Sequence, residues 1–310
     1  MARHEHLRNL ILFGAMAVVL AALPHGLSVY FRSFLLFTMM YVVLALSWNI
    51  ISGFTGYTSF GHVVFYGIGA YACAILVADH GWHWIPTLGV GAALAVVMAF
   101  ALGYPVLRLK GPYFAIAMLG LNEVLRALVS YFEGLTGGGN GLSLPTLDAT
   151  VPIYYAMGLT AIAVTLAARL IIGSRFGLRL MTIREDEVAA EAMGIPTFRH
   201  KLLAFLLSAI GPGIAGALTA RDQGYIEPLS VFPLATTITM IVMTLFGGKG
   251  TVWVPVLGAV VLFVAQEFVW ARYPYIHPLL FGAIIIAVVL AMPRGVLGLL
   301  QLKYRLPRTI

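Results

Sequence analysis

Charge, cysteine and recognisable catalytic clusters are all scarce in this sequence. Only 10% of the 310 residues are charged, and the single cysteine, Cys73, lies within an apolar run. The first shortage excludes a water-soluble domain of ordinary composition, and the second excludes a disulfide framework. The eight histidines are scattered and show no zinc-protease spacing. We therefore predict no enzyme active site in this chain.

A phosphate-binding loop is also missing. The fragment GGKGT, Gly247–Thr251, resembles one, but Met243 stands where the motif requires its first glycine, and Gly250 replaces the magnesium-binding Ser or Thr. We interpret the fragment as a tight turn between two apolar runs. The fragment GIGAYA, 67–72, lies inside an apolar run, where small residues favour close helix packing over dinucleotide binding. Any ATP hydrolysis must therefore come from another chain.

Long apolar runs are what the sequence does contain. Hydrophobic residues make up 61% of the chain, and the mean hydropathy is +0.95. Runs near 20 residues are long enough to cross about 30 Å of hydrocarbon. The sequence therefore predicts an all-α polytopic membrane protein that forms a single transmembrane domain over residues 1–310. We expect ten spans, near residues 8–23, 33–51, 55–78, 85–107, 112–132, 151–173, 199–220, 230–247, 252–271 and 275–292.

The basic residues predict how these spans are oriented. The formal net charge is +7, and the basic residues gather at the ends of apolar runs, which indicates membrane orientation and disfavours nucleic-acid binding. With both termini in the cytoplasm, the long 174–198 loop lies inside and the 133–150 loop lies outside. The cytoplasmic ends then carry Arg3, Arg8, Arg294, Lys303, Arg305 and Arg308. The first 26 residues also fit a cleavable secretory signal, whose removal would leave the other nine spans oriented as before.

One stretch, TIREDEVAAEAMGIP (182–196), is unusually acidic. We predict a helix of about 11 residues that begins with a capping box of Thr182 and Glu185. It ends where Gly194 adopts the left-handed conformation and Pro196 prevents continuation. Such a helix is too short to span and lies on the cytoplasmic surface. It is either a solvated connector or a helix that docks into a groove on another protein. Its small apolar side comprises Val188, Ala189, Ala192 and Met193, and its charged side comprises Arg184, Glu187 and Glu191.

A second stretch, SGFTGYTSFGHVVFYG (52–67), combines glycines and hydroxyl residues at the start of a predicted span. Each glycine weakens a helix by roughly 1 kcal/mol. The pattern is typical of a broken or re-entrant segment, which at membrane depth lines a cavity or is buried in protein. A loop at the inner surface is the alternative. The candidates for lining or gating a pathway are Thr55, Tyr57, Thr58, Ser59 and His62.

Two charged residues, Glu123 and Arg126, fall within the predicted span 112–132, beside Asn122. They lie about 18–22 Å from its inner end at 1.5 Å per residue. An ionised side chain at such depth is costly unless it is paired or hydrated, and the i, i+3 spacing lets these two pair. The pair either holds the bundle together or takes part in a pathway.

Several segments resemble one family of membrane proteins. Ala189–Gly194 is similar to the EAA loop of ABC-importer permeases, although Val188 stands where that motif usually has glutamate. The segments 176–218, 52–62, 110–126 and 135–145 resemble, in order, the permease subunits of ABC importers for branched-chain amino acids, of the LivM type. The resemblance covers nearly the whole chain.

This resemblance implies a set of partners. A second, similar permease would enclose one pathway with this chain in the bacterial inner membrane. Two ATP-binding subunits would hold ATP and magnesium on the cytoplasmic face, so this chain needs no cofactor of its own, and a periplasmic binding protein would deliver the solute. The residues that couple to the ATPase would be Arg184, Glu185, Glu187, Val188, Ala189, Ala190, Glu191, Ala192, Met193 and Gly194.

The solute is less well defined than the transport class. Leucine, isoleucine and valine are the family's default, while related importers carry urea, short amides or aromatic acids. An ion-coupled secondary transporter is the alternative from a different class, with Glu123 as its candidate carboxylate.

Overall fold

The computed structural model describes residues 28–145 and 150–272, together with positions 14, 279, 282, 283 and 286. The predicted spans near 8–23 and 275–292 fall largely outside the described residues, as do the basic residues of both termini. The described structure therefore does not test the orientation that the basic residues of the two termini predict.

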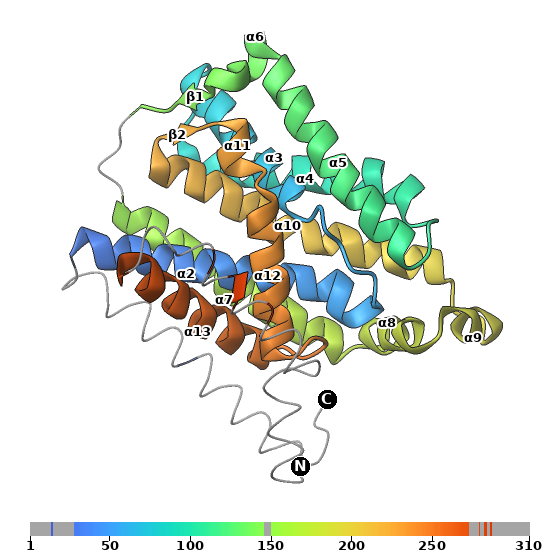
Figure 1. Cartoon of the computed structure of the whole chain (residues 1–310). Coiled ribbons are helices and arrows are strands. Elements are labelled where there is room, and N and C mark those ends of the chain that lie inside the picture. Colours follow the sequence, from blue (N-terminus) through green and yellow to red (C-terminus); the bar gives the residue numbers. More distant parts are fainter. Residues whose placement is uncertain are drawn as a thin grey trace.

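Helices make up nearly all of the described structure (Figure 1). Six are long and apolar enough to cross a membrane, and Val63–Ala78 and Trp253–Val269 are shorter apolar helices. This confirms the all-α polytopic class, but it does not confirm the count of ten spans. The helices are α2 (Val29–Trp48), η1 (Asn49–Gly53), α3 (Val63–Ala78), α4 (Trp84–Val106), α5 (Pro112–Tyr131), α6 (Glu133–Thr136), η2 (Gly138–Asn140), α7 (Thr150–Ile172), α8 (Arg175–Glu185), α9 (Glu187–Ala192), α10 (Thr197–Gln223), α11 (Pro228–Val231), α12 (Leu234–Gly247) and α13 (Trp253–Arg272).

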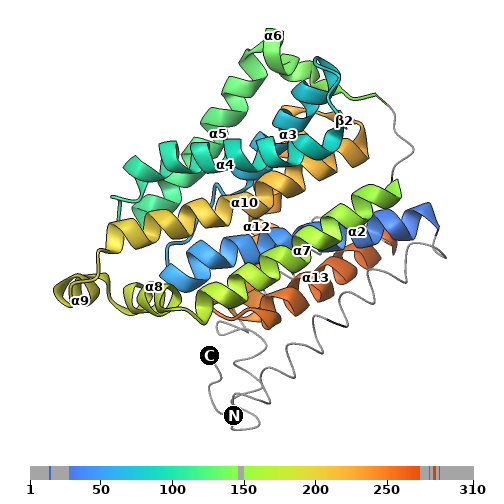
Figure 2. The same ribbon diagram turned by 180° about the vertical axis from the view of Figure 1, so that it is seen from behind.

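The bundle has two distinct ends (Figures 1 and 2). Helices α8 and α9 project at one end, and α6 lies at the other beside the short strands β1 (Leu142–Ser143) and β2 (Tyr225–Ile226). The two strands pair antiparallel, with Leu142 opposite Ile226. We call the end at which α8 and α9 project the α9 end, and the opposite end of the bundle the α6 end. The strand pair ties the loop after α5 to the loop after α10 at the α6 end.

Helix α10 forms the centre of the bundle and packs against α2, α3, α4 and α7. Small residues make this packing close. A Cβ atom on Gly213 of α10 would lie 2.8 Å from Cβ of Ala95 in α4, and one on Gly216 would meet the carbonyl oxygen of Tyr66 in α3. In α3, Gly69 faces the backbone of Gly213 in the same way. Its fragment, GIGAYA, therefore serves helix packing, as predicted.

Two predicted spans differ from the observed helices. The span predicted at 55–78 becomes a continuous helix only at Val63, because the backbone is irregular from Gly56 onward. The span predicted at 230–247 is divided into α11 and α12. Pro233 lies at this division and has no N–H to continue the hydrogen-bond ladder of α11. Both interruptions occur where the chain remains packed inside the bundle.

Helix α5 is bound to the bundle along one narrow stripe. Its buried residues, Phe114, Met118 and Asn122, recur every fourth position. Flanking residues such as Leu121 are partly buried, and the opposite side, including Tyr113 and Ile116, is exposed in the isolated chain. Since an apolar helix face is not stable in water, this surface must lie against lipid or against another membrane protein.

Candidate functional site

Helix α9 begins at a different cap from the one expected. The carboxylate of Asp186 accepts hydrogen bonds from the backbone N–H groups of Val188 and Ala189, at 2.8 and 3.0 Å. Thr182 lies within α8, where its hydroxyl donates to the carbonyl oxygen of Leu178. The predicted capping box is therefore wrong. Helix α8 continues through Glu185, so the chain breaks at Asp186 and α9 has six residues instead of about 11.

The end of α9 agrees with the prediction. Gly194 has a φ of +83°, in the left-handed region that favours glycine. The N–H groups of Gly194 and Ile195 donate to the carbonyl oxygens of Glu191 and Ala190, so the last turn is closed. A bulky residue at 194 would strain this turn through its backbone alone, since nothing lies within 4 Å of the position of its Cβ.

The small apolar side of α9 is uncovered. Val188 and Met193 are 66% and 67% exposed, and Ala189 and Ala192 are exposed beside them. Ala190, on the opposite side, is fully buried. The described chain therefore presents a compact apolar surface, about one helical turn long, that points away from its own bundle.

On the charged side of α9, Glu187 turns toward the bundle, whereas Glu191 remains exposed. Glu187 accepts hydrogen bonds from Lys201 at 2.6 Å and from the Tyr57 hydroxyl at 2.5 Å. Lys201 is 3% exposed and also donates to the Tyr57 hydroxyl at 2.8 Å. A third hydrogen bond of 3.3 Å joins Lys201 to the carbonyl oxygen of Leu107. We call Tyr57, Glu187 and Lys201 the anchor triad.

The ionisation of Glu187 reflects this environment. Burial by itself raises the pKa of its carboxyl group, but the hydrogen bonds from Lys201 and Tyr57 and the positive charge of Lys201 outweigh burial. The pKa therefore lies below its ordinary value of 4.5. Glu187 is a carboxylate at neutral pH, and the ion pair with Lys201 is intact.

Two further contacts tie α8 and α9 to the spans. The hydroxyl of Thr197, the first residue of α10, donates to Glu191 at 2.5 Å. Arg184, near the end of α8, donates to the carbonyl oxygen of Gly53 in η1 at 3.1 Å. Its guanidinium also packs against Gly250, where a Cβ atom would collide with it. Of the predicted coupling residues, Arg184, Glu187 and Glu191 thus hold α9 to the bundle, and Glu185 pairs with Arg184 at the surface.

The turn after α12 is joined to the same region. Asn49 of η1 accepts a hydrogen bond from the N–H of Gly250 at 2.9 Å and donates to the carbonyl oxygen of Thr251 at 2.6 Å. Gly248 and Gly250 both have positive φ, as a tight turn requires. The predicted turn at GGKGT is confirmed, and it connects α12 and α13 to η1.

Lys201 and Asn49 were not among the predicted site residues. Each is a strongly polar residue within or beside an apolar run, which is itself a signal of a functional or structural partner. What the sequence does not contain is the partner's identity. Lys201 and Glu187 are 14 residues apart and come together only because the chain reverses after Gly194.

The predicted broken segment adopts irregular backbone between η1 and α3, and most of it is buried. The Trp48 indole donates to the carbonyl oxygen of Ser59 at 2.8 Å, and His62 Nε2 lies 3.1 Å from the carbonyl oxygen of Ser208. Thr55 donates to Ile51 within its own turn. Among the predicted pathway residues, Tyr57 is also a member of the anchor triad, and Thr58 is half-buried. The segment extends from the anchor triad into the bundle.

Glu123 and Arg126 form the predicted ion pair, with a 2.5 Å separation. Their side chains are 43% and 37% exposed, and both belong to α5, so the pair links no two helices. Asn122 points the other way: it is fully buried and donates to the carbonyl oxygen of Phe232 at 3.2 Å. The ion pair therefore lies on a surface of α5 that the described chain leaves open.

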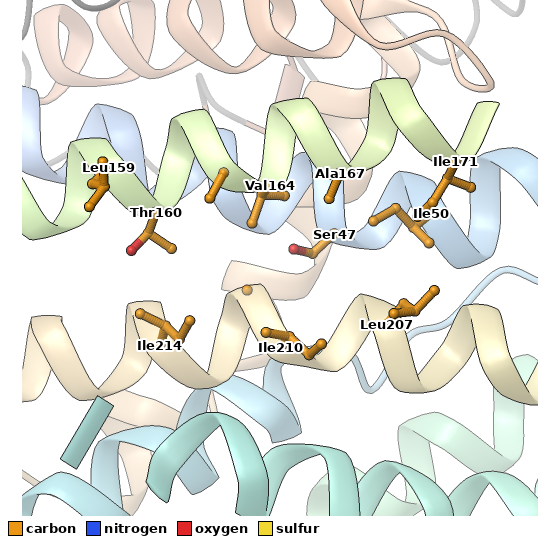
Figure 3. Close-up of a pocket in the computed structure, with 12 residues that line it drawn as sticks. Ser47, Ile50, Leu159, Thr160, Val164, Ala167, Ile171, Leu207, Ile210 and Ile214 are labelled. Atoms are coloured by element: carbon orange, nitrogen blue, oxygen red, sulfur yellow. The ribbon is translucent and has the colours of Figure 1, made fainter. Parts of the chain in front are cut away.

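An apolar groove of about 310 Å³ runs between α7 and α10, with α2 at its floor. Figure 3 shows Leu159, Val164 and Ala167 of α7 facing Leu207, Ile210 and Ile214 of α10. Only Ser47 and Thr160 contribute hydroxyl groups. The groove suits an acyl chain or an apolar side chain. Within residues 28–145 and 150–272, no three His, Cys, Asp or Glu residues are grouped closely enough to hold a metal ion.

These observations define a class of protein: an all-helical membrane protein whose short surface helix is anchored by charge to its spans. The family model described as "Branched-chain amino acid transport system / permease component" matches residues 30–289, and the chain belongs to this family.

Individual relatives agree with this assignment. The chain is 31% identical to the high-affinity branched-chain amino acid transport system permease protein LivM of Escherichia coli K12, over 87% of this chain and 70% of that protein. It is 26% identical to the permease protein LivH of the same organism, over 83% of this chain and 91% of that protein. The probable LivM protein of Methanocaldococcus jannaschii is also 26% identical, over 85% and 92% of the two chains. No solved structure matches the chain.

Proposed function

We propose that this chain is the permease subunit of an ATP-driven importer of branched-chain amino acids, and that α9 docks on an ATP-binding subunit. One observation carries the proposal: α9 exposes its small apolar side while Glu187 on its acidic side is bound to buried Lys201. A solvated connector needs no buried lysine to hold it, and it gains nothing from exposed Val188 and Met193. A helix that docks into a groove needs both features.

The contacts of α9 give a route by which docking could move the spans. A displacement of α9 reaches α10 through Thr197 and Lys201, and it reaches the irregular segment before α3 through Tyr57. Through Arg184 it reaches η1 and the turn at Gly250. We propose that ATP binding and hydrolysis, with magnesium, take place on two partner subunits, and that this chain converts their movement into opening and closing of the pathway.

The proposed orientation places the α9 end in the cytoplasm of a bacterial cell. The basic residues at that end are more numerous, namely Arg108, Lys110, Arg175, Arg179, Arg184, Arg199 and Lys249. The α6 end carries Arg32, Arg221 and Arg272. This difference follows the positive-inside rule. A periplasmic binding protein would then deliver the solute at the α6 end.

The exposed surface of α5 supports a second permease as a partner. Glu123 and Arg126 are half-exposed within an apolar helix, where contact of charged groups with lipid tails is unfavourable. A second, similar permease that covers α5 would enclose the pair in the interface or in a pathway between the two subunits. Two such subunits would form the complete transmembrane part of the importer.

Purification in mild detergent from the native membrane tests this assembly, with mass spectrometry of the accompanying chains. We expect a second permease and ATPases with phosphate-binding loops. Reconstituted vesicles should then take up leucine only when ATP and the binding protein are present. A chain that purified alone and transported solute without ATP would refute the proposal.

A further inference from the structure

The division between α11 and α12 lies toward the α6 end of the bundle, since α11 directly follows strand β2. Helix α12 has 14 residues and therefore spans about 21 Å, which is less than the roughly 30 Å of a bilayer's hydrocarbon. Its last residue, Gly247, adjoins the turn that binds Asn49 at the α9 end. Its first residue, Leu234, is therefore about 20 Å from that end. The short α11 packs against α3 and α5 at this depth (Figure 1).

Two side chains and one glycine contact Phe232, which lies with Pro233 between these two helices. Asn122 of α5 donates to its carbonyl oxygen at 3.2 Å. The Tyr71 ring of α3 stacks on the Phe232 ring, with centroids 6.2 Å apart and planes inclined by 14°. The Phe232 ring also lies directly on Gly67, where any Cβ atom would collide with it. Phe232 is 1% exposed, so in this conformation its ring is packed against α3 while its carbonyl oxygen faces Asn122 of α5.

Unpaired polar atoms occur on residues of the three helices that meet at this division. Within the described residues, Oδ1 of Asn122, the hydroxyl of Tyr71 and the hydroxyl of Thr237 are buried and have no hydrogen-bond partner. Buried polar groups are paired in nearly all native structures, because an unmade hydrogen bond costs about 1–3 kcal/mol. Three unpaired groups near one interruption of a helix are difficult to explain by packing alone. They are explained if the site binds a polar molecule during the protein's working cycle.

The first turn of α12 supplies the complementary groups. The first N–H groups of a helix have no acceptor within it and carry a partial positive charge. The N–H of Thr236 already donates to the carbonyl oxygen of Pro233 at 3.1 Å, so the amides left for a ligand are those of Leu234, which is half-buried, and Ala235, which is exposed. Interrupted helices in transporters commonly use such N-termini to bind anionic groups of the solute.

We propose that the α11–α12 division is a binding subsite for the charged backbone of an α-amino acid, which Phe232 closes. The solute's carboxylate binds the first amides of α12, and its ammonium group donates to Asn122 Oδ1 and to the Tyr71 hydroxyl. Its apolar side chain packs on the displaced Phe232 ring. This inference rests on the proposed function, since it names the part of the permease that the imported solute contacts.

Photolabelling of the complete transporter tests the subsite. The probe is a diazirine analogue of leucine with free amino and carboxyl groups, supplied with the binding protein to proteoliposomes and trapped with ATP and vanadate. After illumination, mass spectrometry locates the label. We expect label on residues 228–237 or on α5 around Asn122. We expect its yield to fall at least fivefold in Asn122→Leu and at least threefold in Tyr71→Phe.

Tyr154→Phe is the matched control, because Tyr154 of α7 is equally buried but lies away from Phe232. Its label should stay within twofold of the wild type. Tyr71→Phe removes one oxygen and keeps the ring. It therefore tests the subsite by itself if the transporter with Asn122→Leu does not assemble. Two results would overturn the subsite while the wild type still imports leucine. The label could be confined to the groove of α7 and α10, or its yield could be undiminished in both variants. If the complete wild-type transporter imports no amino acid, the proposed function fails as well.

Discussion

Replacing Lys201 with methionine tests whether the anchor triad couples α9 to the spans. The substitution keeps the length and apolar stem of the side chain and removes the ammonium group that binds Glu187, Tyr57 and Leu107. Separating a buried ion pair costs about 3–5 kcal/mol. The Glu187 side chain is 16% exposed and can turn toward water, so we expect about 2–3 kcal/mol here. That shifts the equilibrium between anchored and released α9 roughly 30- to 150-fold.

The assay compares leucine uptake with ATP hydrolysis in proteoliposomes that contain the complete transporter. Uptake by Lys201→Met should fall at least tenfold, while ATP hydrolysis stays within threefold of the wild type, because the apolar side of α9 remains available for docking. Lys249→Met is the control, since Lys249 is exposed at the same end of the bundle.

A double-substitution cycle with Glu187→Gln separates coupling from general damage. If the two residues act as one unit, the double variant loses no more uptake than Lys201→Met alone. Losses that multiply, or wild-type uptake in Lys201→Met, would contradict the anchoring role.

Four other outcomes follow from the same geometry. Gly194→Val should uncouple ATP hydrolysis from uptake without removing the protein from the membrane, because a β-branched residue disfavours the φ of +83° by about 1–2 kcal/mol; Gly194→Asn should retain most uptake, and wild-type uptake in Gly194→Val would defeat the claim. Val188→Glu should abolish co-purification of the ATP-binding subunits, and unchanged subunit stoichiometry would argue against docking by this side of α9. The contact between Glu187 and Lys201 should be intact at neutral pH and should loosen only as the pH falls below about 4.5, because the lowered pKa of Glu187 gives stability that is lost on protonation. The anisotropy of a fluorophore attached at Val188→Cys should report this transition, and the transition should be absent in Glu187→Gln. Gly216→Val should lower the thermal stability of the purified complex strongly, because its Cβ meets the backbone of Tyr66; a melting temperature within about 1 °C of the wild type would contradict the packing argument.

Much of the bundle could be predicted from hydropathy. The spans from 85–107, 112–132 and 151–173 agree with α4, α5 and α7 to within two residues, because each run is predominantly apolar and bounded by polar or turn residues. Prediction failed where backbone continuity was decided by tertiary contacts. The hydrogen bond between Asn49 and the turn at Gly250 supports the wide η1 turn. No residue near Asn49 in the sequence indicates that this contact forms.

The candidate site could be predicted in part. The acidic composition and Gly194 located a surface helix, but the choice between Thr182 and Asp186 as its cap depended on how far α8 continued. The inward orientation of Glu187 could not be predicted. Its partner Lys201 lies after the chain reversal at Gly194, and the sequence does not determine the angle of that reversal. Glu123 and Arg126 were paired correctly since their spacing on one helix determines the contact.

The glycine contacts between α10 and its neighbours have a mechanical consequence. Backbone touching backbone, as at Gly69 and Gly213, leaves no side chains that could repack to let the helices slide. Helix α10 has 27 residues and is therefore about 40 Å long, and it starts next to α9. A tilt of roughly 5° at Thr197 would carry its far end about 3.5 Å, together with the α3 and α4 helices locked to it. A small push at one membrane surface would thus arrive, enlarged, at the strand pair on the other.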